Sequence, residues 1–117
     1  MFLPSWWTKA NSLLLRNETP AGNWLQVQVR ANKPVNRMGI GTRIYVYPAG
    51  KLGSRPDLLG CREIATGFGY ASGQPAICHF GLGGEASVDV ELILPNGAGT
   101  HTLKGAKANQ RITMPLP

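Results

Sequence analysis

The sequence predicts an all-β fold, a small antiparallel β-sandwich or a barrel-like sheet of about seven short strands. Apolar and polar residues alternate in several short runs, and 15 Gly and 9 Pro are scattered between these runs as turns. Nowhere do ten residues keep a helical period with capping residues. The length of 117 residues corresponds to one domain, and an apolar share of 43% provides for one modest core.

Residues 1–22 differ from the rest of the chain in their pattern of apolar and polar residues. They contain Trp6, Trp7 and the apolar run 13–15 without clean alternation, and they end in a turn cluster at 17–22. We therefore divide the chain into an N-terminal segment, residues 1–22, and a β domain, residues 23–117.

The first four expected strands follow this segment. In the first, Leu25, Val27 and Val29 alternate with polar residues, which is typical of a half-buried strand. The second is dense in β-branched and aromatic residues, and a glycine-rich loop separates the third from the fourth. These strands are expected at residues 25–30, 42–47, 59–66 and 76–82.

The last three expected strands span residues 88–94, 100–103 and 110–114. In the first of them the apolar residues lie on one face, and Asp89 and Glu91 are expected on the solvent face. The Asn-Gly pair that follows Pro95 is a strong hairpin signal. In the final strand, Ile112 and Met114 are expected to face the core.

The net charge of +6 arises from twelve Lys and Arg against six Asp and Glu, spread singly along the chain. There is no basic run, basic helix or aromatic-basic repeat, so a solvated basic surface is favoured over nucleic-acid binding. No stretch approaches the roughly 20 apolar residues of a transmembrane helix. The opening residues 1–7 lack the features of a secretory signal, so either none was present or this chain is the tail of a longer protein.

Cys61 and Cys78 leave the redox compartment undecided. They lie seventeen residues apart on either side of a turn-rich stretch, and this spacing would let them face each other across a hairpin. Buried free thiols are the commoner state of such a pair in a β domain, and a disulfide is the alternative.

The search for reactive groups indicates no enzyme, no metal and no cofactor. His79 and His101 are far apart in the sequence, and Cys78 and His79 are neighbours whose side chains leave opposite faces of a strand. The acidic residues at 85–91 do not form an opposed carboxyl pair. Two glycine-rich stretches, Gly39-Ile40-Gly41 and residues 81–84, could bind a phosphate only if each opened a helix. Strand-like sequence flanks both, so they are interpreted as turns or bulges.

Several ordered motifs resemble one family, the ASPIC/UnbV domain. Residues 36–44, NRMGIGTRI, resemble its signature NRxGIGAxV. The other similar pieces, in family order, are NWLQV at 23–27 (HWLxV in the family), REI at 62–64 with GFGYAS at 67–72 (REV…GxGYxSQ), and CHFGLG at 78–83 (LHFGLG). PNG at 95–97 and ANQ at 108–110 echo two more, so the resemblance covers about residues 23 to 114.

This family, which includes cartilage acidic protein-like members, has no settled biochemical activity. Its members look like secreted or envelope-facing proteins in which this domain follows an FG-GAP/VCBS propeller. The resemblance therefore implies a protein-contact module of an extracellular or periplasmic protein. Residues 11–17 also resemble the last strand of a propeller repeat, so residues 1–22 are a propeller-strand remnant or a partner anchor. Met38, Gly73 and the basic charge depart from the family pattern.

Two functional hypotheses follow. The first is an interaction domain that docks on a propeller, a protein or a glycan. The second is an accessory subunit that its aromatic N-terminus anchors to a larger assembly. That assembly could be membrane-associated, and the N-terminus itself could touch a membrane surface. A third reading, a binder of nucleic acid or an anionic surface, predicts retention that falls steeply with salt. The candidate partner-binding residues are Phe2, Leu3, Trp6, Trp7, Asn36, Arg37, Tyr70 and Ser72. The candidate structural glycines are Gly39, Gly41, Gly67, Gly69, Gly81 and Gly83, and Arg37 and Arg62 are expected to pair with Glu63 or with loop carbonyls.

Overall fold

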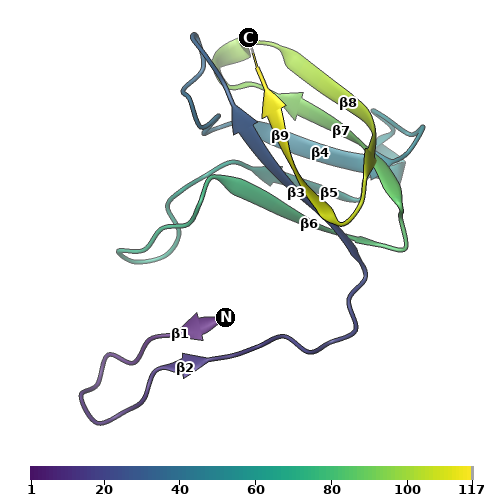
Figure 1. Ribbon diagram of the computed structural model, residues 1–117. Coiled ribbons are helices and arrows are strands. Elements are labelled where there is room, and N and C mark those ends of the chain that lie inside the picture. Colours follow the sequence, from purple (N-terminus) through teal and green to yellow (C-terminus); the bar gives the residue numbers. More distant parts are fainter. Residues whose placement is uncertain (117) are drawn as a thin grey trace.

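A computed structural model of the chain describes residues 1–116, and its regular structure consists of strands and two short 3₁₀ turns (Figure 1). A small hairpin precedes the main body, and the body holds the seven strands β3 to β9. The strands are β1 (Phe2–Leu3), β2 (Leu13–Leu14), β3 (Asn23–Arg30), β4 (Arg43–Pro48), β5 (Gly60–Glu63), β6 (Ile77–Gly83), β7 (Ser87–Ile93), β8 (Thr100–Lys107) and β9 (Gln110–Pro115). The 3₁₀ turns are η1 (Arg55–Asp57) and η2 (Pro95–Gly97).

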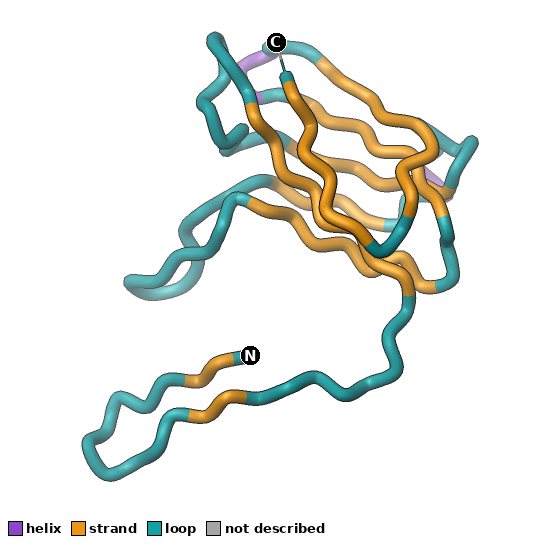
Figure 2. Tube along the Cα trace, in the orientation of Figure 1, coloured by secondary structure: helices purple, strands orange, loops and turns teal. Residues whose placement is uncertain are grey.

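The seven strands form two sheets that pack face to face (Figure 2). One sheet has the order β6-β3-β9 and the other the order β5-β4-β7-β8. This arrangement confirms the all-β class and the sandwich, since the sheets do not close into a barrel. The expectation of a purely antiparallel fold is wrong for one pair, because β9 runs parallel to β3. The chain leaves β8 in one sheet and enters the other beside β3, so β8 and β9 do not pair as a hairpin.

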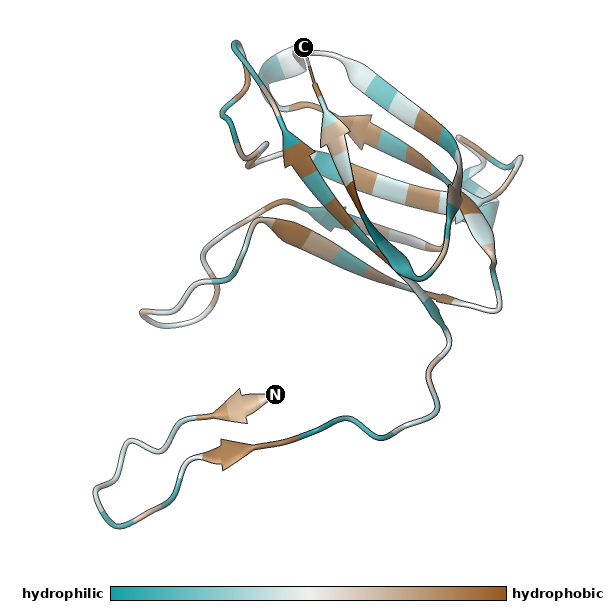
Figure 3. Ribbon diagram, viewed as in Figure 1, coloured by the Kyte–Doolittle hydropathy of each residue, from teal (hydrophilic) through white to brown (hydrophobic). Residues whose placement is uncertain are grey.

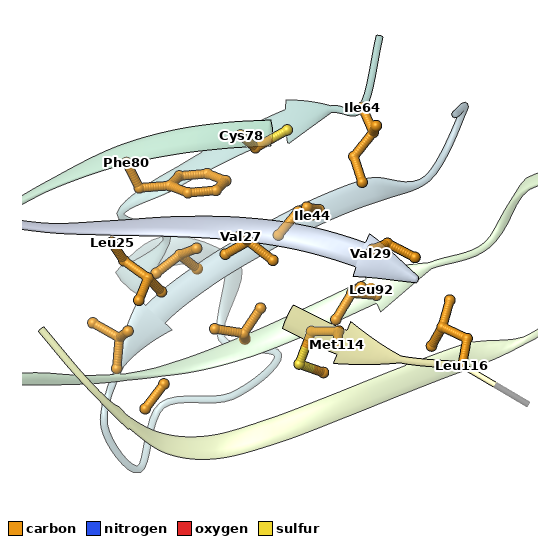
Figure 4. Packing of buried hydrophobic residues seen from close by; sticks show 14 of the residues in the cluster. Leu25, Val27, Val29, Ile44, Ile64, Cys78, Phe80, Leu92, Met114 and Leu116 are labelled. Atoms are coloured by element: carbon orange, nitrogen blue, oxygen red, sulfur yellow. The ribbon is translucent and has the colours of Figure 1, made fainter. Parts of the chain in front are cut away.

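The core lies between the two sheets and follows from the alternation in the sequence. Leu25, Val27 and Val29 of β3 are at most 4% exposed and belong to one cluster with Ile44 of β4 and Leu92 of β7 (Figure 4). Phe80, Leu82 and Met114 complete it from the neighbouring strands. Burial of each large apolar side chain contributes about 1.5–3 kcal/mol relative to its exposed state. This cluster therefore fixes which face of β3 looks outward.

The solvent-facing placement predicted for Asp89 is wrong. Asp89 is 2% exposed, and its carboxylate accepts hydrogen bonds from the backbone N–H groups of Gly50 at 2.9 Å and Gly105 at 2.8 Å. The connection between β4 and β5 contacts this outer face of the larger sheet through Gly50 and through Arg55, whose guanidinium lies 4.1 Å from the centre of the Tyr45 ring. Tyr47 is buried as well, and its hydroxyl donates to Glu91 at 3.1 Å.

The expectation that Cys61 and Cys78 lie on the two strands of one hairpin is also wrong. β5 and β6, which carry them, belong to different sheets, and the residues between them form a long loop. Both thiols are free in the structure, with Cys61 exposed and Cys78 buried. β5 is also shorter than expected, because the chain leaves the sheet after Glu63.

The N-terminal segment forms a separate hairpin at a distance from the sandwich (Figure 1). Phe2 pairs with Leu14 and Leu3 with Leu13, and the terminal amine of Met1 donates to the carbonyl of Leu15 at 2.6 Å. The sequence did not predict β1, whereas β2 lies within residues 11–17, the segment that resembles a propeller strand. Figure 3 shows that both are coloured as apolar segments although they lie outside the core.

Candidate binding surfaces

The N-terminal hairpin exposes several of its apolar side chains to solvent. Trp6 is 92% exposed and Trp7 77%, and Phe2 and Leu3 are also exposed. The main chain turns back through hydrogen bonds of the Ser5 hydroxyl with the backbone of Trp7. All four candidate anchor residues therefore lie on one small element that the β domain does not cover.

The loop between β3 and β4 contains two further candidates with different roles. The side-chain amide of Asn36 closes a turn, donating to the carbonyl of Ile40 at 2.9 Å and accepting from its N–H at 2.8 Å. Arg37 is exposed and lines a hollow of about 490 Å³ with Arg30 and Lys33. Asn36 thus shapes the loop, whereas Arg37 contributes positive charge to its surface.

The loop between β5 and β6 carries the remaining candidates, Tyr70 and Ser72, and projects from the sandwich (Figure 1). Tyr70 is 97% exposed. The hydroxyl of Ser72 donates to the carbonyl of Phe68 within the same loop. The structure therefore uses Ser72 to hold the loop and leaves Tyr70 free for contact.

The glycines predicted as backbone positions fall into two groups. Gly39, Gly41, Gly69 and Gly83 have positive φ. At Gly39, with φ of 66°, a Cβ atom would lie only 2.6 Å from Cγ1 of Val29, so a side chain there would meet the core. Gly67 and Gly81 do not have positive φ, and a Cβ atom at either would meet open space. Gly81 is the cross-strand neighbour of Trp24, so its lack of a side chain leaves open space next to Trp24 in the sheet.

The hollow beside the cysteines includes one buried thiol, that of Cys78. It has a volume of about 470 Å³ and is lined by Cys61, Arg62, Glu63, Cys78 and His79 among others. Burial raises the pKa of the Cys78 thiol to about 11, and the nearby Arg62 only partly offsets this. The thiol is therefore protonated near neutral pH and is a poor nucleophile.

The ion pairs expected for Arg37 and Arg62 are not formed. Within residues 1–116 the structure contains one ion pair, in which Nζ of Lys51 lies 3.7 Å from Oδ2 of Asp57. Arg62 and Glu63 are adjacent in β5, so their side chains leave opposite faces of the strand. In the same part of the chain no three His, Cys, Asp or Glu side chains gather as a metal site would require, and no helix is long and apolar enough to cross a membrane.

The outer face of the smaller sheet carries a group of side chains that sequence reasoning did not select. The rings of Trp24 and His79 stack at a centroid distance of 5.9 Å and an angle of 17°. Gln26 lies beside His79, with 3.5 Å between its amide nitrogen and the imidazole Nδ1, and its amide oxygen accepts from Nε of Arg111 at 2.8 Å. The available signal was the alternation in β3, which placed Trp24 and Gln26 opposite the core face.

The fold and these surfaces define a small β-sandwich module that presents side chains from loops, from one sheet face and from a terminal hairpin. The model of the ASPIC and UnbV family matches residues 32–115, and the chain belongs to this family. No curated protein and no solved structure matches the chain. The family's domain is an extracellular or envelope-associated module that usually accompanies FG-GAP repeats.

Proposed function

We propose that this chain is a non-catalytic protein-binding module of an extracellular or envelope protein, and that its N-terminal hairpin makes the contact. The observation that carries the proposal is the exposure of Trp6 and Trp7 together with the apolar side chains around them. Tryptophan is enriched at interfaces, where a large ring that becomes buried provides much of the binding free energy. The family's usual neighbourhood makes an FG-GAP repeat protein the first candidate partner.

The hairpin has little to stabilise it within its own chain. Its two strands pair through only two residues each, and an isolated two-stranded hairpin is marginally stable in water. Leu14, in β2, is 83% exposed. An apolar patch of this kind on a small domain usually marks a contact surface. A partner that covers the hairpin would bury these side chains and fix its conformation.

Three observations support a role without catalysis. The Cys78 thiol is protonated near neutral pH because burial raises its pKa. The Asp89 carboxylate is buried and already holds two backbone N–H groups. The imidazole of His79 stacks on Trp24, and its Nδ1 lies 3.5 Å from the side-chain nitrogen of Gln26. These three groups, of the types that most often perform acid–base or nucleophilic chemistry, are thus engaged in structure.

The alternative role is an accessory subunit that is permanently built into a larger assembly through the same hairpin. The apolar character of the hairpin favours this reading, because permanent interfaces are more apolar than reversible ones. The two roles differ in the lifetime of the contact. A reversible module will be recovered largely free from the partner, whereas a subunit will remain bound through extensive washing.

The proposal is tested with the full chain carrying a C-terminal affinity tag in its source cells. Partners are isolated from wild type, from a chain lacking residues 1–8, and from the double variant Trp6→Ser, Trp7→Ser. Phe68→Ser is the matched control, since Phe68 is also exposed but lies in another loop. We expect both N-terminal variants to remain folded and to lose a partner that wild type and the control retain. Retention of the same partner by the truncated chain would disprove the role of the hairpin.

A further inference from the structure

We propose that the outer face of the smaller sheet binds an acidic polysaccharide, a chain of sugar rings that carries carboxylate or sulfate groups. This ligand and this face are separate from the protein contact made by the hairpin. The face, named here the Trp24 face, consists of the outward residues of β6, β3 and β9. They are Trp24, Gln26, Gln28, Arg30, Ile77, His79, Gly81, Gly83, Arg111, Thr113 and Pro115.

An aromatic platform lies at one end of this face. The half-buried indole of Trp24 and the exposed imidazole of His79 are nearly parallel, so their position on the sheet is fixed before any ligand arrives. Gly81 is the direct cross-strand neighbour of Trp24, and the space that a side chain would occupy there is empty. The C–H side of a sugar ring is slightly positive and stacks on the electron-rich face of an indole. The absence of a side chain at Gly81 gives such a ring room beside Trp24.

A row of hydrogen-bonding groups crosses the sheet next to this platform. His79, Gln26 and Arg111 are successive cross-strand partners on β6, β3 and β9. Arg111 donates through Nε to Gln26, and this bond holds the guanidinium in place while its terminal N–H groups are left to donate. A planar guanidinium held in this way can bind a carboxylate or sulfate through two parallel hydrogen bonds. The arrangement therefore offers ring stacking and anion recognition side by side.

The positive charge of the Trp24 face favours a negatively charged ligand. Its outward residues include Arg30 and Arg111 and no Asp or Glu. Arg30 also lines the hollow that contains Lys33 and Arg37, so positive charge continues beyond the end of β3. Trp24 and Arg30 are six residues apart on one strand, which separates them by about 20 Å. A polymer with a repeated negative charge would satisfy both ends at once, whereas a single sugar would reach only one.

The test measures binding of the full chain to immobilised dextran sulfate and alginate, with neutral dextran and single-stranded DNA as comparison ligands. Gly81→Val is the most informative variant, because valine suits an exposed strand position and would fill the space beside Trp24. Trp24→Ala removes the platform, and Arg111→Gln removes the held cation. Lys104→Gln, on β8 of the other sheet, deletes one exposed charge as the matched control. Thermal unfolding of each variant shows whether it is folded.

We expect dextran sulfate or alginate to bind, neutral dextran to bind more weakly, and both Gly81→Val and Trp24→Ala to lose about tenfold or more in affinity. Arg111→Gln should weaken binding and reduce its salt dependence, while the Lys104 variant should stay within about twofold of wild type. Absence of binding to both acidic polysaccharides would overturn the proposal. So would equal binding to neutral dextran, and so would binding that Gly81→Val and Trp24→Ala leave intact, because charge alone would then explain it. Tighter binding of DNA that the same variants abolish would assign the face to nucleic acid instead.

Discussion

Replacing Asp89 is expected to be among the most damaging changes to a polar residue of this domain. Its carboxylate holds two backbone N–H groups from different segments, Gly50 in the connection after β4 and Gly105 in β8. It is 2% exposed, so water cannot take its place without local opening. Hydrogen bonds to a charged group contribute about 1.5–3 kcal/mol each, and a buried donor left without a partner adds its desolvation cost.

From these contacts we expect Asp89→Ala to lower the free energy of unfolding by about 3–6 kcal/mol. Asp89→Asn keeps the shape and one acceptor oxygen but points an amide N–H₂ at the second donor, so we expect a loss of about 2 kcal/mol. Since the free energy of unfolding of small domains is about 5–15 kcal/mol in total, the alanine variant should be close to unfolding at 37 °C.

The assay is urea unfolding followed by tryptophan fluorescence and circular dichroism, with Glu63→Gln as the control. Glu63 is an exposed carboxylate on the same sheet and makes no ion pair within residues 1–116. The control should unfold within about 0.5 kcal/mol of wild type. An Asp89→Ala variant that loses less than about 1 kcal/mol would show that the two hydrogen bonds do not hold the β4–β5 connection as described.

Four further predictions concern three other buried positions, Thr42, Gly39 and Cys78. Thr42 is fully buried and its hydroxyl has no hydrogen-bond partner, so Thr42→Val should leave the midpoint of thermal unfolding unchanged or raise it, and a clear decrease would show that the hydroxyl is satisfied. Gly39→Ala should cost about 2–4 kcal/mol in chemical denaturation, because φ is positive and the new Cβ would meet Val29; a loss below 1 kcal/mol would refute the packing there. At pH 8, iodoacetamide should alkylate Cys61 and spare Cys78, as peptide mass spectrometry would show, and equal labelling would contradict the burial of Cys78. Because the pKa of Cys78 is raised from 9.0 to about 11 in the folded state, its contribution to stability is complete below pH 9 and is lost as the pH rises through 11, which pH-dependent urea unfolding would detect.

The sequence predicted the sandwich because its signals are local. Alternation in the first and fifth expected strands sets which side chains enter the core, and Leu25, Val27, Val88 and Val90 are all fully buried as this pattern requires. Turn residues then place the strand ends within a few positions. The family motifs indicated the ASPIC/UnbV resemblance from other residues, and the family match over residues 32–115 confirms that resemblance.

The features that the sequence did not predict depend on contacts between distant segments. Asp89 alternates as a solvent-facing residue should, but two distant segments, the β4–β5 connection at Gly50 and β8 at Gly105, meet its buried carboxylate on that face. The parallel pairing of β9 with β3 depends on which sheet the last strand enters, and no local pattern encodes this choice.

The grouping on the Trp24 face has the same origin. Trp24, His79 and Arg111 come from three strands, so only the register of the sheet brings them together. The alternation in the expected strand 25–30 showed that Gln26 points outward, but it could not show what lies beside it. By contrast, the exposed Trp6 and Trp7 were selected from the sequence, because a segment without alternation offers no core face to bury them.

Hydrogen–deuterium exchange of the full chain, free and bound to the partner that it recovers from its source cells, tests most directly whether the N-terminal hairpin makes the contact. The hairpin residues have few backbone hydrogen bonds, so their amides should exchange rapidly in the free chain. We predict that binding slows exchange over residues 1–16 and leaves the strands of the β domain unchanged. Slowed exchange confined to other surfaces, with residues 1–16 exchanging as fast as in the free chain, would contradict the proposed function.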